Sequence, residues 1–490
     1  MGNDYSQYML EIRQIPSNIC VIHATSFLLY GVNLTQDLIK SMADIYLEIW
    51  GKEVKIKPMC NSIVKFKPHK LIMYTAGDAK TSAKSKQMFC RFQKIFCHFG
   101  WSLVSSPTLT FQFSLSTWFF YKNINPCMVE TGGSENEFCV IGLSSFDKLQ
   151  FIDFPQALEQ SVINCTKKNW IKGTQEKEVI YTGSSSWSLQ LNGTPWSSHG
   201  EQSLDARNLV LCLIRFMSHH NWRLVNSTAM KPDASDTMFF RQYTKAFSID
   251  CPETMPEYYF MLALMGKDYF SILGGDTVIW NTVADSCRKY ESKGIETPKV
   301  KHKYPSVTAV SDLWSRRNEK SMETKLLITC IFQELAAIGW LPIESIDCTR
   351  SIKDLSSIAF VRIPAVRMIY FCLCPRKYNG ICLINAVEEV QSIVYDTFVQ
   401  YYVIKKEEIK RSTYGIATSI DFIGSPFRGG NEHGILLFQV ALAAIITTLK
   451  EAGWFLVVSA DTSNETLSRS KQSDIKWSIY GLWFSKLLAS

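Results

Sequence analysis

The sequence lacks most of the patterns that identify a particular chemistry. It has no C-x-x-C pair and no H-E-x-x-H, so it predicts no zinc site. The glycine-rich stretch FRGGNEHG at 427–434 precedes an apolar run but lacks the lysine of a phosphate-binding loop. We therefore expect neither a metal nor a cofactor, and a chain that is not an enzyme.

Long apolar runs are also missing. A membrane-spanning helix needs about 18 or more apolar residues, and the closest stretch, GILLFQVALAAIITTL at 434–449, is interrupted by Gln439. The beginning, MGNDYSQYMLEIRQ, has no basic region followed by an apolar one, so it predicts no secretory signal. The 15 cysteines are scattered and odd in number, which favours reduced thiols over disulfides. These absences predict a cytoplasmic protein.

What is present is a short phrase that occurs four times in 490 residues. It reads FGWSLVSS at 99, HNWRLVNS at 220, IGWLPIES at 338 and AGWFLVVS at 452. Its tryptophans are Trp101, Trp222, Trp340 and Trp454, separated by 114 to 121 residues. A near-constant period of this length indicates tandem units the size of small domains. With 46% hydrophobic and 13% aromatic residues, the chain can give each unit its own core.

Other residues keep fixed distances from each tryptophan. Apolar residues recur 12, 9 and 5 positions before it, which places them on one face of a helix. The residue directly before it favours a left-handed helix end: Gly100, Asn221, Gly339 and Gly453. An aromatic anchor stands 26 or 27 residues before it: Tyr74, Trp196, Trp314 and Phe427. The phrase is thus a helix end, a core tryptophan and the start of a strand.

These signals predict a unit of five strands and two helices in the order ββαβαββ. The strands would form one mixed or antiparallel sheet with both helices on one face, an α+β arrangement. The predicted units span residues 5–125, 135–245, 255–365 and 366–490. The first is the most divergent, because its anchor phrase KLIMYTAGDAK lacks the Pro-Trp and the glutamate of the others.

Positive charge gathers in the first unit. The chain carries a net charge of +7, whereas residues 52–94 alone hold 11 Lys or Arg against two acidic residues. Such an excess attracts nucleic acid or an acidic membrane, although a solvated basic face is the simpler alternative. The candidate binding residues are Lys65, Lys67, Lys70, Lys80, Lys84, Lys86, Arg91 and Lys94. The start MGNDYS also fits a myristoylation pattern with Gly2 as acceptor.

Candidate catalytic groups are few. His199 stands near Glu201 and His433 beside Glu432, and such pairs could serve acid–base chemistry in a hydrolase. A serine follows each repeated tryptophan by five residues, with an aspartate two residues later in units three and four. We expect these serines to hydrogen-bond local backbone.

The repeated phrases resemble those of a group of fungal and metazoan proteins whose repeats read roughly KLxGxPW…GEE…GWxLxxSxD…FF. Unit two best matches the anchor and unit four best matches the tryptophan phrase. The matching residues are Leu191, Asn192, Gly193, Pro195, Trp196, Gly200 and Glu201, then Gly453, Trp454, Leu456, Ser459 and Asp461. The resemblance supports a tandem repeat and implies no activity.

The sequence therefore predicts a non-enzymatic, cytoplasmic binding or scaffold protein made of four α+β units. A protein partner is the first expectation, with reversible membrane association through unit one as a further possibility. The alternatives are a nucleic-acid-binding protein that uses the basic face of unit one, and a hydrolase that uses either His–Glu pair.

Overall fold

The fold is taken from a computed structural model. It describes residues 16–25, 28–60, 62–68, 79–107, 114–122, 137–180, 185–230, 235–243, 258–291, 293–314, 318–349, 355–376, 380–401, 410–414, 417–421, 432–462 and 480–488.

Helix boundaries follow from capping residues in the sequence. The Thr35 hydroxyl accepts a hydrogen bond from the Leu38 N–H at the start of α2 (Gln36–Trp50), and Gly51 ends that helix at φ 67°. The Asp276 carboxylate accepts from the Ile279 N–H at the start of α6 (Thr277–Tyr290). Each cap satisfies a backbone group that the helix itself leaves unpaired.

The elements occur in the same order in every unit. Unit 1 contains β1 (Ile19–Thr25), β2 (Leu29–Val32), α2, β3 (Lys55–Cys60), β4 (Ile63–Lys67), α3 (Ala79–His98), β5 (Trp101–Ser105) and β6 (Ser114–Lys122). Unit 2 contains β7 (Phe138–Ser144), β8 (Lys148–Ile152), α4 (Glu159–Asn169), β9 (Thr174–Val179), β10 (Trp187–Leu191), α5 (Gly200–His219), β11 (Trp222–Thr228) and β12 (Thr237–Gln242).

The second half of the chain repeats this order. Unit 3 contains β13 (Tyr259–Met265), β14 (Tyr269–Leu273), α6, β15 (Lys299–Lys301), β16 (Tyr304–Thr308), α7 (Asn318–Ala337), β17 (Trp340–Ile346) and β18 (Ser357–Arg362). Unit 4 contains β19 (Met368–Arg376), β20 (Gly380–Ile384), α8 (Glu388–Tyr401), β21 (Lys410–Tyr414), β22 (Ala417–Asp421), α9 (Glu432–Glu451), β23 (Phe455–Asp461) and β24 (Tyr480–Leu487).

Each unit forms one six-stranded antiparallel sheet, so the α+β prediction is confirmed. The order across the sheet is the same in all four; in unit 1 it is β3-β4-β2-β1-β6-β5. The unit has one strand more than the sequence pattern indicates, because β3, β9, β15 and β21 were not foreseen. These strands lie at a sheet edge, and TQEKEV of β9, for example, carries no apolar alternation.

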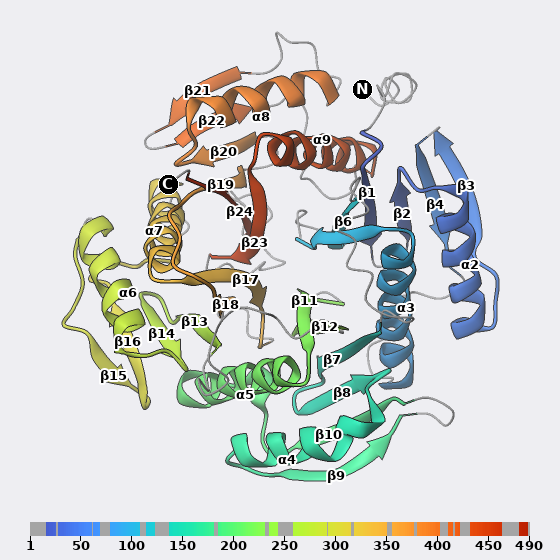
Figure 1. The fold of residues 1–490 in the computed structure, drawn as a ribbon, viewed down its shortest axis with the longest axis horizontal. Helices are drawn as coiled ribbons and strands as arrows, with labels where there is room; N and C mark the ends of the chain where they lie inside the picture. Colours follow the sequence, from blue (N-terminus) through green and yellow to red (C-terminus); the bar gives the residue numbers. More distant parts are fainter. Residues whose placement is uncertain are drawn as a thin grey trace, which may run out of the picture.

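The four units are arranged in a ring (Figure 1). The second helix of each unit contacts the first strand of the next unit: α3 contacts β7, α5 contacts β13, and α7 contacts β19. The helix α9 of unit 4 contacts β1 of unit 1 and closes the ring. The added strands β3, β9, β15 and β21 lie at its periphery, whereas β11, β17 and β23 point toward its centre (Figure 1).

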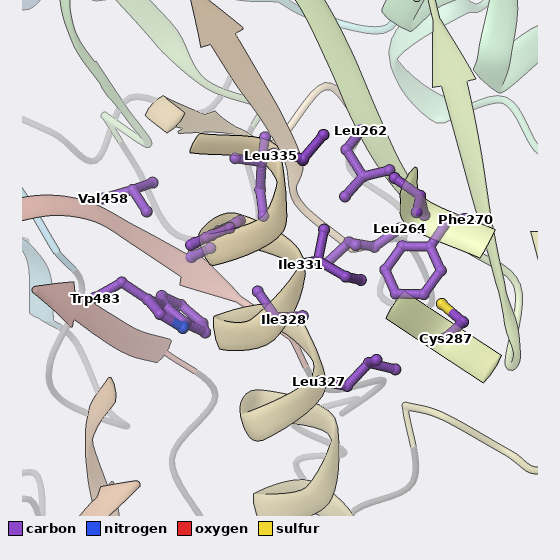
Figure 2. Packing of buried hydrophobic residues seen from close by; sticks show 14 of the residues in the cluster. Leu262, Leu264, Phe270, Cys287, Leu327, Ile328, Ile331, Leu335, Val458 and Trp483 are labelled. Atoms are coloured by element: carbon purple, nitrogen blue, oxygen red, sulfur yellow. The ribbon is translucent and has the colours of Figure 1, made fainter. Parts of the chain in front are cut away.

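Each sheet is therefore buried on both faces over most of its width. Figure 2 shows α7 with Leu262 and Phe270 of its own unit on one side and Val458 and Trp483 of unit 4 on the other. The closing core likewise joins α9 to Ile19 and other residues of unit 1. Burial on both faces explains why strands such as YFMLALM of β13 are apolar throughout rather than alternating.

The repeated phrase has the predicted local structure. Gly100, Asn221, Gly339 and Gly453 all have positive φ, between 63° and 89°. The tryptophans that follow are at most 3% exposed and stand at or directly before the strands β5, β11, β17 and β23. A second left-handed position follows the second strand of each unit, at Asn33, Asp153, Gly274 and Asn385. Asparagine, aspartate and glycine are the residues that tolerate this conformation, so their recurrence at one position of each unit indicates it.

Candidate functional site

The inner strands of the four units meet around the ring axis. Strand β5 contacts β11 and β23, and β17 contacts β11 and β23. Each inner strand carries a register shift at the same place, the third residue after the repeated tryptophan. A bulge bends a strand and increases its twist. The four bulges therefore aim the following residues of every unit at the same central region, which we call the axial cluster.

The repeated serines belong to the axial cluster and hydrogen-bond across unit boundaries. The Ser106 hydroxyl donates to Asn226 Oδ1 at 2.5 Å, and Ser105 Oγ donates to Ser459 Oγ at 3.3 Å. Ser345 Oγ donates to the Ser459 carbonyl. The prediction that these serines hydrogen-bond local backbone is therefore wrong for Ser106 and Ser345, because the bulges turn them toward the neighbouring units.

Two carboxyl groups lie in the same cluster and were not identified from the sequence. Asp236 Oδ2 accepts both the Asp347 N–H at 2.9 Å and the Ser227 hydroxyl at 3.0 Å, joining units 2 and 3. Burial raises the pKa of Asp236 to about 7, although these two hydrogen bonds oppose the shift. Glu344 shares its offset from the tryptophan with no carboxylate of another unit, and Asp236 shares its offset with Asp354 alone, so no signal common to the four units marked them.

Glu344 directly follows the bulge of β17, and its Oε1 accepts the Ser345 N–H at 3.0 Å. Its pKa lies well above the usual range, first because burial disfavours the charge and then because the Asp236 carboxyl is near. Burial therefore favours the protonated forms of both carboxyl groups in the axial cluster. Raised carboxyl pKa values also occur at active sites. The hydrogen bonds of this cluster, however, join one unit to the next.

A further repeated position joins the units beneath their sheets. Fifteen residues before each tryptophan stands a long polar side chain that is at most 4% exposed: Lys86, Arg207, Lys325 and Gln439. Lys86 Nζ donates to Gln150 Oε1 of unit 2, and Arg207 Nε donates to Ser357 Oγ of unit 3 at 2.7 Å. The sequence shows this fixed offset, but it does not stand out as a repeat because the residue type differs from unit to unit.

At the other two junctions this position meets different groups. Gln439 Nε2 lies 2.7 Å from His23 Nδ1 and donates to Thr117 Oγ1 at 3.1 Å, so it joins unit 4 to unit 1. The Lys325 ammonium lies near the thiols of Cys372 and Cys374 in unit 4 and donates to Ser321 Oγ at 3.0 Å.

The predicted basic residues of unit 1 divide into two groups. Lys86 is buried as described, and Lys84 Nζ donates to the Ile49 carbonyl at 2.8 Å. Arg91 pairs with Glu48 at 2.5 Å and stands 4.0 Å from the Asp153 carboxylate. Lys67, Lys80 and Lys94 are exposed, Lys65 is partly buried, and Lys70 lies outside the described residues.

A cavity of about 610 Å³ lies between units 1 and 2. Arg91, Lys94, Glu137 and Asp153 line it together with aromatic side chains such as Phe138. Burial raises the pKa of Asp153, although Gln87 donates a hydrogen bond to it at 2.7 Å. The lining carries both signs of charge, so it does not select a ligand by charge.

The two proposed His–Glu pairs have little support as active sites. Glu201 lies 3.9 Å from His302 of unit 3, and both side chains are more than 40% exposed. His199 is exposed at the start of α5. The side chains of Glu432 and His433 lie outside the described residues.

The aromatic anchors of units 2 and 3 stabilise the turn between the first two strands of their unit. The Trp196 indole donates to the Lys148 carbonyl and the Trp314 indole to the Met265 carbonyl, each at 3.0 Å, and both side chains are buried. Tyr74, Phe427 and the possible acylation residue Gly2 are outside the described part of the chain.

The described residues hold neither a cluster for a metal ion nor a helix that could span a membrane. No group of three or more His, Cys, Asp or Glu among them could hold a metal ion. None of the helices within the same residues has the length and apolar character needed to cross a membrane.

Comparison with known proteins finds one similarity. A family model for a single domain matches the chain three times, at residues 137–241, 258–361 and 369–477, which together are more than half of its length. These matches correspond to units 2, 3 and 4 of the ring. No curated protein and no solved structure is significantly similar to the chain.

Proposed function

Because the chain belongs to the family defined by that tandem-repeated domain, we propose that it is a non-enzymatic, cytoplasmic binding or scaffold protein. The observation that carries this proposal is the use of the repeated polar residues. Serines of the axial cluster and buried polar residues of the helices form hydrogen bonds between units, so they are not available to bind a ligand. The surface left for partners is then the rim of the ring.

The rim of unit 1 is the part of that surface we assign to an anionic partner. Lys67, Lys80 and Lys94 remain exposed there, within the segment that carries more positive charge than the whole chain. An acidic membrane is the partner we favour, with an acyl group on Gly2 as a second membrane signal. One acyl chain alone binds a membrane only marginally, so the basic surface is needed for lasting attachment.

The second candidate function is nucleic-acid binding by the same basic surface. It shares the electrostatic requirement, since phosphate contacts supply most of non-specific affinity. A hydrolase is the least supported alternative, because the exposed Glu201 lies by His302 rather than in an enclosed pocket. A protein partner for the remaining rim is also part of the proposal. We further propose that the matched family is the group whose repeats carry the KLxGxPW…GEE…GWxLxxSxD…FF phrases.

Vesicle flotation of the full chain tests the proposal. We expect flotation with vesicles that contain phosphatidylserine, none with pure phosphatidylcholine, and a decrease with added salt. Gly2→Ala expressed in cells tests acylation, with intact-mass analysis to detect the acyl group. Absence of flotation with any acidic vesicle, together with a tight RNA complex, would transfer the proposal to nucleic acid.

A further inference from the structure

The two outer strands of unit 1 stack lysine on lysine. In the antiparallel register of β3 and β4, Lys55 pairs with Lys67 and Lys57 pairs with Lys65. Directly paired residues lie on one face of a sheet, as do residues two apart on a strand. All four lysines therefore share one face, which we call the lysine ladder. On the opposite face, Phe66 is buried in the core of unit 1.

The ladder is accessible from solvent. Lys55, Lys57 and Lys67 are exposed, and their side chains form no hydrogen bond or ion pair with another described residue. Lys65 is partly buried, with its ammonium 5.2 Å above the ring of Tyr30. The four lysines are in register with each other, and Lys65 is also in register with Tyr30 on the next strand inward.

The corresponding outer strands of units 2 and 3 carry ion pairs that neutralise charge. In unit 2, Glu178 pairs with Lys148 at 2.9 Å and Lys177 pairs with Glu159. In unit 3, Lys299 pairs with Glu296 at 3.0 Å. These ribbons share their place in the fold with β3 and β4, so the fold itself does not require the ladder.

Like charges placed directly opposite each other destabilise a sheet. The ladder therefore weakens the outer strands of unit 1 unless an anion covers it. Neighbouring lysines stand about 5 Å apart across the strands and about 7 Å apart along them, measured at Cβ. An anion that spans this array must carry two or more negative groups at a similar spacing.

We propose that the lysine ladder binds the headgroup of a multiply phosphorylated membrane lipid. The proposal rests on the membrane association put forward above and names the group that is recognised. Lysine binds phosphate as a point charge without bidentate geometry. Adjacent phosphates on one headgroup meet neighbouring pairs of the ladder, whereas a single carboxylate or phosphodiester engages one pair.

The surroundings of the ladder favour a lipid over single-stranded nucleic acid. Binding of single strands relies on exposed aromatic rings on which bases stack. Among the described residues of unit 1, the large hydrophobic side chains that are clearly exposed are the aliphatic Leu47 and Ile56. Ile56 is in register with Phe66 and so lies on the opposite face, which leaves the ladder face with neither side chain.

Flotation of the full chain with three vesicle types tests the site. The vesicles are phosphatidylcholine alone, with phosphatidylserine, and with phosphatidylinositol bisphosphate at the same total charge. We expect the bisphosphate vesicles to bind most tightly and free inositol trisphosphate to compete. The double variant Lys55→Ala/Lys57→Ala should weaken this binding about 25-fold, because each lysine near the membrane surface contributes about fivefold. The matched control Lys299→Ala/Lys301→Ala on β15 should leave it unchanged.

A second variant separates binding from folding. Lys57→Glu creates an opposite-charge pair with Lys65, so the melting temperature should rise or stay the same while binding falls. Equal binding to both acidic vesicles at matched charge overturns the inference and leaves the proposed function standing. Flotation with neither acidic vesicle overturns both. Unchanged binding of the double variant, with new self-association, would show that the lysines only protect a sheet edge.

Discussion

The Asp236 carboxyl gives the sharpest test of how the ring is sealed. Its pKa is raised from 3.8 to about 7 by burial between units 2 and 3. Between about pH 4 and pH 7 the folded state therefore holds a proton that the unfolded state has released. Folding stability contributed by this group falls as pH rises through that window and is constant above it.

The size of the effect follows from the shift. At about 1.4 kcal/mol per pKa unit, a shift of this size costs the ring about 4 kcal/mol above pH 7. Local relaxation lowers this, and we expect about 2–3 kcal/mol. The substitution Asp236→Asn removes the charge. Both hydrogen bonds to the carboxyl end on the single atom Oδ2, so the one amide oxygen of asparagine can accept both.

The measurement is urea unfolding of the wild type and Asp236→Asn at about pH 5 and about pH 8. We expect the variant to gain stability relative to the wild type as pH rises, by about 1 kcal/mol over this range, because part of the cost is already present at about pH 5. The control Asp285→Asn removes an exposed carboxylate that pairs with Arg288. It should show no such gain. A variant that is less stable than the wild type at pH 8 would refute the reasoning.

Three further outcomes test the packing of the units, each by the midpoint of urea unfolding. Trp454→Ala should cost about 3–5 kcal/mol, because a buried side chain in the core that closes the ring is lost; a loss below about 1 kcal/mol would contradict this. Gly339→Ala should destabilise by more than about 1 kcal/mol, since φ is 89° and the added Cβ would stand 2.6 Å from the Ile363 carbonyl. Asn221→Gly, at the same position of unit 2, should be neutral or stabilising, and equal losses at both sites would exclude the left-handed explanation. Lys325→Met should leave stability unchanged or raise it, because a buried charge gives way to an apolar chain of similar length; a loss above about 2 kcal/mol would show that the ammonium is needed.

Local signals in the sequence predicted the parts of the fold that depend on backbone geometry. The residues before each tryptophan adopt the left-handed conformation because glycine and asparagine are the residues that tolerate it. The strand β15, which reads KVK, was missed because an exposed edge requires no apolar alternation. Ring closure was missed because contacts such as Gln439 to His23 join residues 416 positions apart.

The axial cluster could not be predicted from local sequence patterns, because its contacts also join residues far apart in the chain. The Asp236 carboxyl matters through a hydrogen bond to the Asp347 backbone in another unit. Nothing in the residues around Asp236 indicates that partner. The serines were found by their offset, but their acceptors depend on how the four units meet.

Closure of the ring also sets the order of events during synthesis. Strand β1 has one face that is covered by α9, which begins at Glu432. A ribosome adding about 5–20 residues per second needs roughly 20–80 s to travel from one to the other. Throughout that interval the apolar surface around Ile19 and Val21 has no covering helix. Until α9 emerges, this apolar surface therefore exposes the nascent chain to aggregation.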